Sequence, residues 1–143
     1  MGRYALERIP APEAAEALRE ALAKTSGEQK AGIAGSLGVR RDKESVSDLA
    51  ALLGDSDELV ALAAATALGD IGTVESAKAL QNAAASAEPV KVRVADARLT
   101  AAEKLLAAGD RAAARKVYTS LIGSPVKSIK LAATRGMLMA SGK

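Results

Sequence analysis

The feature that most constrains the fold of this chain is an internal repeat with an interval of 31 residues. Leucine recurs at this interval as Leu6, Leu37, Leu68 and Leu99. Further columns keep the same interval, namely Glu13, Glu44 and Glu75, then Leu18, Leu49 and Leu80, then Ala5, Ser36 and Ala67. Several columns in one phase indicate stacked structural units, each of which buries its apolar face against its neighbours.

Within each unit the apolar residues have helical spacing. In the second unit Val46, Leu49 and Leu53 form one stripe, and a second stripe consists of Val60, Ala64, Ala67, Leu68 and Ile71. Each unit therefore holds two helices. The composition agrees, because 34 of the 143 residues are alanine, the best helix former, while phenylalanine and tryptophan are absent. The sequence predicts an all-α fold with a shallow core.

Capping and turn residues divide the chain into helices. Gly54 is followed by three capping candidates, Gly109 is followed by Asp110, and Pro12 and Pro125 suit the first turn of a helix. We expect helices over residues 12–24, 28–38, 43–53, 57–70, 74–86, 88–108, 110–122 and 125–140, with residues 4–10 as the tail of a preceding helix. The short connections make consecutive helices antiparallel. The expected architecture is a right-handed α-solenoid of about four antiparallel helix pairs.

We interpret residues 1–143 as a single α-solenoid domain. The expected repeats are residues 1–38, which are partly truncated, then 39–72, 73–109 and the divergent 110–143. The whole chain carries +3, too small a surplus to indicate a nucleic-acid or lipid partner by itself.

The second repeat resembles a known family. The run from Asp55 to Val60, together with Ala64-Ala65-Thr66-Ala67-Leu68-Gly69-Asp70-Ile71-Gly72, is similar to the HEAT-like helical repeat of the PBS-lyase type. The likeness is good over residues 5–87 and fades beyond, where the last pair resembles a tetratricopeptide helix. Ala61 stands where the family usually has an arginine. The resemblance implies a solenoid of the kind found within large multidomain bacterial proteins, so we expect the chain to be a segment of one.

The residue inventory narrows the chemistry. Without histidine or cysteine the chain has no imidazole or thiolate for catalysis, zinc binding or disulfides, and we expect neither an enzyme, a metal site nor a cofactor. No apolar run reaches the roughly 20 residues that span a bilayer, and the first ten residues lack the apolar centre of a signal peptide. We expect a soluble protein with no membrane partner, cytoplasmic by default, or exported if the chain belongs to a longer one.

Five groups of residues allow both a functional and a structural interpretation. Asp55 and Asp57 resemble a cation site but suit helix capping better. Asp96 is either a buried acid or, in the favoured interpretation, an exposed partner of Arg93. The glycines Gly32, Gly35 and Gly38 lack a phosphate-loop context and fit close helix packing. Two basic clusters read as solvated rims or as patches for an anionic partner, namely Arg40, Arg41 and Lys43, and Arg111, Arg115 and Lys116.

The favoured function is a non-catalytic scaffold or protein–protein interaction module, with the second helix of each pair lining a concave surface. A spacer that positions flanking domains is the alternative, and a nucleic-acid-binding repeat protein is a minority one, because aromatic platforms are missing. The candidate partner-binding strip is Leu62, Ala65, Arg93, Asp96 and Thr100. Weak self-association through the solenoid ends is a further expectation, with Tyr4, Leu6, Leu18 and Leu22 as its residues.

Overall fold

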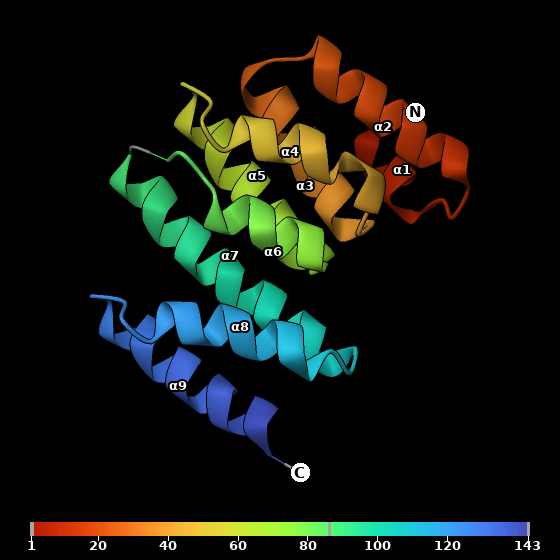
Figure 1. The fold of residues 1–143 in the computed structure, drawn as a ribbon. Coiled ribbons are helices and arrows are strands. Elements are labelled where there is room, and N and C mark those ends of the chain that lie inside the picture. Colours follow the sequence, from red (N-terminus) through yellow and green to blue (C-terminus); the bar gives the residue numbers. More distant parts are fainter. Residues whose placement is uncertain (1, 86, 143) are drawn as a thin grey trace.

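The computed structural model describes residues 2–85 and 87–142, which form nine α-helices and one short 3-10 helix and contain no β-strand (Figure 1). The helices are α1 (Arg3–Arg8), α2 (Pro12–Lys24), α3 (Gly27–Val39), η1 (Lys43–Ser45), α4 (Val46–Leu52), α5 (Glu58–Ile71), α6 (Val74–Gln81), α7 (Glu88–Ala107), α8 (Arg111–Leu121) and α9 (Lys127–Ser141). The all-α prediction is confirmed. No helix in the described part of the chain has the length and apolarity needed to cross a membrane.

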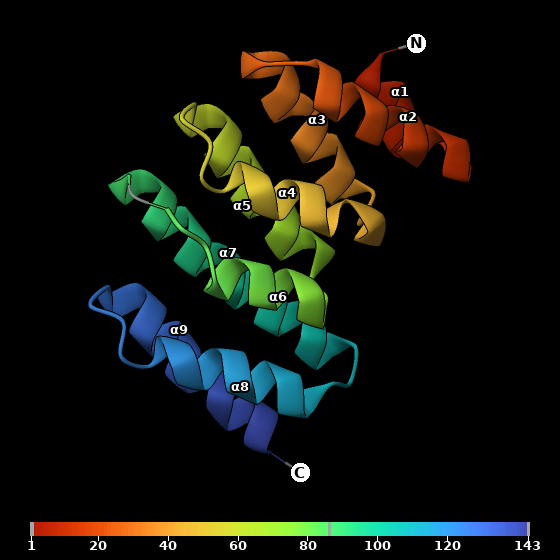
Figure 2. The ribbon, with the colours of Figure 1, turned by 45° about the horizontal axis from the view of Figure 1, so that its top comes forward.

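The helices stack in two rows. Figure 2 shows α2, α4, α6 and α8 in one row and α3, α5, α7 and α9 in the other, with successive pairs in chain order from one end of the stack to the other. The two termini lie at opposite ends (Figure 1). Helix α1 packs against α2 and α3 at the first end. This arrangement is that of an α-solenoid, and residues within each pair and between neighbouring pairs share one core.

Most helix boundaries follow the capping signals, and the exceptions have local causes. Asp57 and Asp110 cap α5 and α8, and Gly72 and Gly109 have left-handed φ values of 63° and 91°. The prediction for 74–86 was too long, because α6 ends at Gln81. Residues 82–85 are not helical, and Ser86, the last residue of that prediction, lies outside the described residues. Pro89 stands in the first turn of α7.

Two other boundaries also differ from the prediction. Helix α9 begins at Lys127, so Pro125 lies before it and not in its first turn. The cause is a turn in which the Ser124 hydroxyl accepts the N–H of Val126 at 3.2 Å. The helix predicted over 43–53 begins as the 3-10 turn η1 before α4.

The second helices approach one another through glycine. A Cβ added to Gly38 of α3 would lie 2.7 Å from the Cα of Ala67 in α5, and one added to Gly69 of α5 would lie 2.9 Å from the carbonyl oxygen of Ala97 in α7. The close-packing interpretation is therefore confirmed for Gly38. It is wrong for Gly35, which faces open space, while Gly32 lies under the flexible side chain of Arg3.

The last pair is joined differently. Tyr118 of α8 is the largest of the fully buried side chains, and its ring covers Gly136 of α9, where an added Cβ would lie 2.3 Å from the ring. Burial, with a smaller contribution from the Glu103 carboxylate, raises the pKa of the Tyr118 phenol. Gly136 therefore meets an aromatic ring within its own helix pair, whereas Gly38 and Gly69 meet the backbone of the next pair.

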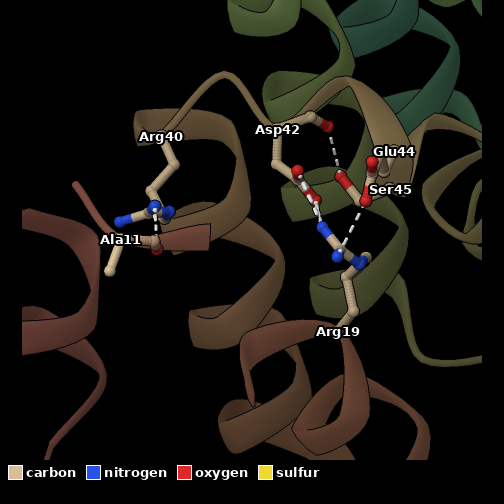
Figure 3. A network of polar contacts seen from close by, with 6 residues as sticks. All are labelled: Ala11, Arg19, Arg40, Asp42, Glu44 and Ser45. Atoms are coloured by element: carbon tan, nitrogen blue, oxygen red, sulfur yellow. Dashed lines mark hydrogen bonds and ion pairs between the residues drawn. The ribbon is translucent and has the colours of Figure 1, made fainter. Parts of the chain in front are cut away.

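Polar contacts hold the first helix in place. The Arg40 guanidinium donates hydrogen bonds to the carbonyl oxygens of Leu6, at 2.7 Å, and of Ile9, and also to that of Ala11, at 3.2 Å (Figure 3). The Ser36 hydroxyl donates to the Glu7 carboxylate at 2.6 Å. A cation that satisfies carbonyls at a helix C-terminus is favourable both as a cap and towards the helix dipole. The solvated-rim interpretation is therefore wrong for Arg40.

A second network lies beside it and ties α2 to the turn before α4. The Arg19 guanidinium donates to both oxygens of Asp42 at 2.8 Å and pairs with Glu44 at 2.8 Å (Figure 3). The pKa of Arg19 is raised, mainly because its guanidinium donates to the Asp42 carboxylate. The Ser45 hydroxyl donates to the Asp42 carbonyl at 2.7 Å, which closes the turn.

Arg40→Ala should release α1 without unfolding the stack. Hydrogen bonds from a charged donor are worth about 1.5–3 kcal/mol, so amides in residues 3–9 should lose protection by roughly 10- to 100-fold in hydrogen exchange. The matched control is Lys43→Ala, which removes an exposed cation from the same connection. Unchanged exchange in α1 would show that Arg40 does not hold it.

Candidate functional site

The predicted partner-binding residues lie on α5 and α7, and the side chains of four of the five are at least partly exposed to solvent. Arg93 and Asp96 are exposed, and Leu62 and Thr100 are half-buried. Ala65 is fully buried, so its place in an exposed strip was wrong. The reason is that Ala65 lies one turn before Gly69, on the side of α5 that packs against α7.

Arg93 connects the two helices. Its guanidinium donates to the Thr66 hydroxyl of α5 at 3.0 Å, and that hydroxyl donates to the Leu62 carbonyl at 3.2 Å. The predicted pairing of Arg93 with Asp96 is wrong, since Arg93 turns towards α5, although Asp96 is exposed as expected. The Thr100 hydroxyl donates to the Asp96 carbonyl at 3.3 Å. The Thr66 contact therefore holds the Arg93 cation against α5, and the exposed Asp96 follows it by about one turn of α7.

Sequence reasoning missed three residues of this surface. Thr66 is the one polar residue between Val60 and Gly69. A single polar residue in an apolar run could have indicated that this position faces solvent. Leu59 and Val92 are 47% and 40% exposed and lie one turn before Leu62 and Asp96. We call the whole surface the α5–α7 strip, and it comprises Leu59, Leu62, Thr66, Val92, Arg93, Asp96 and Thr100.

The acidic pair Asp55 and Asp57 has a structural role. The Asp57 carboxylate accepts the N–H of Leu59 at 3.0 Å as the cap of α5, and the Asp55 carboxylate accepts the N–H of Asp57 at 2.8 Å. The capping interpretation is confirmed for Asp57, while Asp55 stabilises the turn before the helix. Within residues 2–85 and 87–142 no three carboxylates are grouped as metal ligands would be.

The buried polar side chains also have structural roles. They are Ser36, Ser45 and Ser76, and each makes hydrogen bonds to nearby backbone or to a helix end. Ser76 forms a capping box with Thr73, in which each side chain accepts the N–H of the other residue, at 2.9 and 3.1 Å. These hydrogen bonds satisfy the hydroxyl groups, which explains why serine is tolerated in the core.

The residues proposed for self-association are mostly inaccessible. Leu18 and Leu22 are buried, and Leu6 is half-buried, which leaves Tyr4 exposed. The prediction was wrong for Leu18 and Leu22 because they point into the core that α2 shares with its neighbours. Large exposed apolar side chains lie at the other end instead, on α9, as Leu131, Leu138 and Met139.

The family model described as HEAT repeats matches residues 15–98, more than half of the chain. The matched part runs from α2 into α7 and contains Leu62, Arg93 and Asp96. No curated protein matches the chain.

Proposed function

The chain belongs to the HEAT-repeat family, and on that premise we propose that it is a non-catalytic protein–protein interaction module that binds its partner through the α5–α7 strip. HEAT repeats commonly serve as scaffolds or interaction modules. The observation that supports this choice of surface is the Arg93–Thr66 contact, which fixes a charged side chain beside exposed apolar ones.

The composition of the strip suits recognition. Leu59, Leu62 and Val92 offer apolar area, which supplies affinity, and Arg93 and Asp96 offer charges of both signs, which supply selectivity. The backbone under the strip is closely packed, because Gly69 of α5 lies directly on Ala97 of α7. Little ordering is then needed on binding, which favours affinity.

Substitutions in the strip test the proposal. Leu62→Asp and Arg93→Glu should each weaken the binding of a partner isolated with the full chain by more than about 1 kcal/mol, measured by calorimetry. Arg93→Glu is the cleaner variant, because Arg93 is exposed and its loss should change the circular dichroism melt little, whereas Leu62 is half-buried.

Two matched controls change the same residue types elsewhere. Leu131→Asp alters an exposed leucine on α9, and Lys91→Glu alters an exposed cation on α7 outside the strip. Both should leave the affinity unchanged. Equal affinities for all four variants would exclude the strip as the binding site. A full chain that binds no protein at all would favour the spacer function instead.

A further inference from the structure

The charges of the chain are strongly segregated. Residues 111–143 carry seven lysines and arginines and no aspartate or glutamate, while residues 1–110 carry thirteen basic and seventeen acidic residues. The modest +3 of the whole chain is therefore a sum over unlike parts, because residues 111–143, which contain α8 and α9, carry +7. Such a local surplus attracts anionic groups even where the net charge is small.

Part of this charge borders a groove between α6 and α8. Two adjoining hollows of about 500 and 400 Å³ lie there and share Gln81, Ala112 and Lys116. The cations among the lining residues are Lys78 of α6 and Arg115 and Lys116 of α8, and no carboxylate lines either hollow. The remaining walls are largely apolar, with Val74, Ala77, Leu105, Ala113 and Val117.

A fourth cation lies beside the groove. Arg98 of α7 donates from Nη2 to the Ser120 hydroxyl, which lines the groove and in turn donates to the Val117 carbonyl at 2.6 Å. The Nε of Arg98 is buried and has no hydrogen-bond partner within the described residues. Burial also lowers the pKa of Arg98, so this cation is held at a cost that a nearby anion would offset.

We propose that the α6–α8 groove binds a peptide segment of a partner protein in which carboxylate side chains flank apolar ones. The carboxylates pair with Lys78, Arg115 and Lys116, and the apolar side chains enter the hollow beside Val74 and Val117. A nucleic acid would use the cations but not the apolar wall, and the groove has no aromatic side chain on which a base could stack. The groove lies on the row of first helices and is separate from the α5–α7 strip.

A random library of 16-residue peptides displayed on phage, selected on the full chain, provides the probe. The strongest selected peptide is synthesised with a fluorophore and titrated by anisotropy. Two triple variants are compared: Lys78→Glu, Arg115→Glu and Lys116→Glu in the groove, and the control Lys24→Glu, Lys43→Glu and Lys91→Glu at exposed positions outside it. Both change the net charge by the same amount, and their circular dichroism melts verify folding.

Selected peptides should be rich in Asp and Glu together with Leu, Ile, Val or Met. The groove variant should bind the probe about tenfold more weakly than the wild type, from three rim pairs of roughly 0.5 kcal/mol each, and the control within about twofold. The nearly isosteric Val117→Thr should weaken binding about threefold or more, because a hydroxyl replaces a methyl group of the apolar wall.

Several results would overturn the proposal. They are a selection that yields no acidic peptide, a groove variant that binds like the wild type, and a 16-nucleotide thymidine oligomer or inorganic phosphate that displaces the probe at physiological salt. Loss of probe binding on Arg93→Glu, with the groove variant unaffected, would refute the groove and support the strip. The two proposals can therefore fail separately.

Discussion

Replacing Gly38 by alanine should destabilise the protein, although the same change inside a helix ordinarily stabilises it. Alanine gains about 0.5–1 kcal/mol over glycine in helix propensity. At Gly38, however, the new Cβ would lie 2.7 Å from the Cα and 2.9 Å from the Cβ of Ala67, so α3 and α5 must separate. Overpacking of this kind costs about 1–3 kcal/mol, and Gly38→Leu should cost more.

A matched control lies one turn away on the same helix. A Cβ at Gly35 meets nothing within 4 Å, so Gly35→Ala should show only the gain in propensity and raise the free energy of unfolding. Urea unfolding of both variants gives the comparison. Opposite signs are the expected result, and stabilisation by both substitutions would mean that α3 and α5 are not in backbone contact.

Tyr118→Ala should be among the most destabilising single substitutions in the last helix pair. The ring is 2% exposed and fills the space over Gly136, so its removal leaves a cavity between α8 and α9. Aromatic-to-alanine changes in cores cost about 3–5 kcal/mol. Because repeats contact only their neighbours, the loss should concentrate in α8 and α9.

Tyr118→Phe is the control for this cavity. It keeps the ring and should cost less than about 1.5 kcal/mol, as volume-conserving core changes do. Chemical denaturation combined with hydrogen exchange resolves both the size and the location of the effect. Equal losses for the two variants would assign the stability to the hydroxyl and not to the ring.

The sequence was sufficient for the architecture because the repeat and the caps are local signals. Pro12, Asp57 and Asp110 each act within one helical turn, and the helix ends they predicted agree with the structure to within a residue. The failures had two sources, a local turn and a contact between distant elements. Ser124 accepts a backbone N–H and delays α9 beyond Pro125, and Arg40 reaches back some thirty residues to hold α1.

The candidate site was predicted only in part, because contacts between helices decide which side chains are exposed. The interval of 31 relates positions along the chain but does not fix how each helix is rotated about its axis. Gly69 and Ala97 set that rotation for α5 and α7, and the result buries Ala65 and half-buries Leu62 while Arg93 and Asp96 stay exposed. The contact of Arg93 with Thr66 depends on this packing, so no spacing in the sequence contains it.

The positive charge of residues 111–143 could be counted in the sequence, but the net charge of the whole chain does not show it. Arg111, Arg115 and Lys116 were recognised as a cluster, but the absence of any carboxylate from residues 111–143 becomes informative only once a groove is known beside them. A net charge describes solubility and encounter better than it locates a binding surface.

The most direct test of the α5–α7 strip as the binding surface is photo-crosslinking from it in the native cells of the full chain. A photoreactive amino acid replaces either Leu59 or Val92, which are exposed strip residues, and Ser47, exposed on the row of first helices, serves as the control position. We expect a discrete covalent adduct with another protein from both strip positions and not from Ser47. That adduct should disappear when Arg93→Glu is added. No adduct from either strip position, or the same adduct from Ser47, would contradict it.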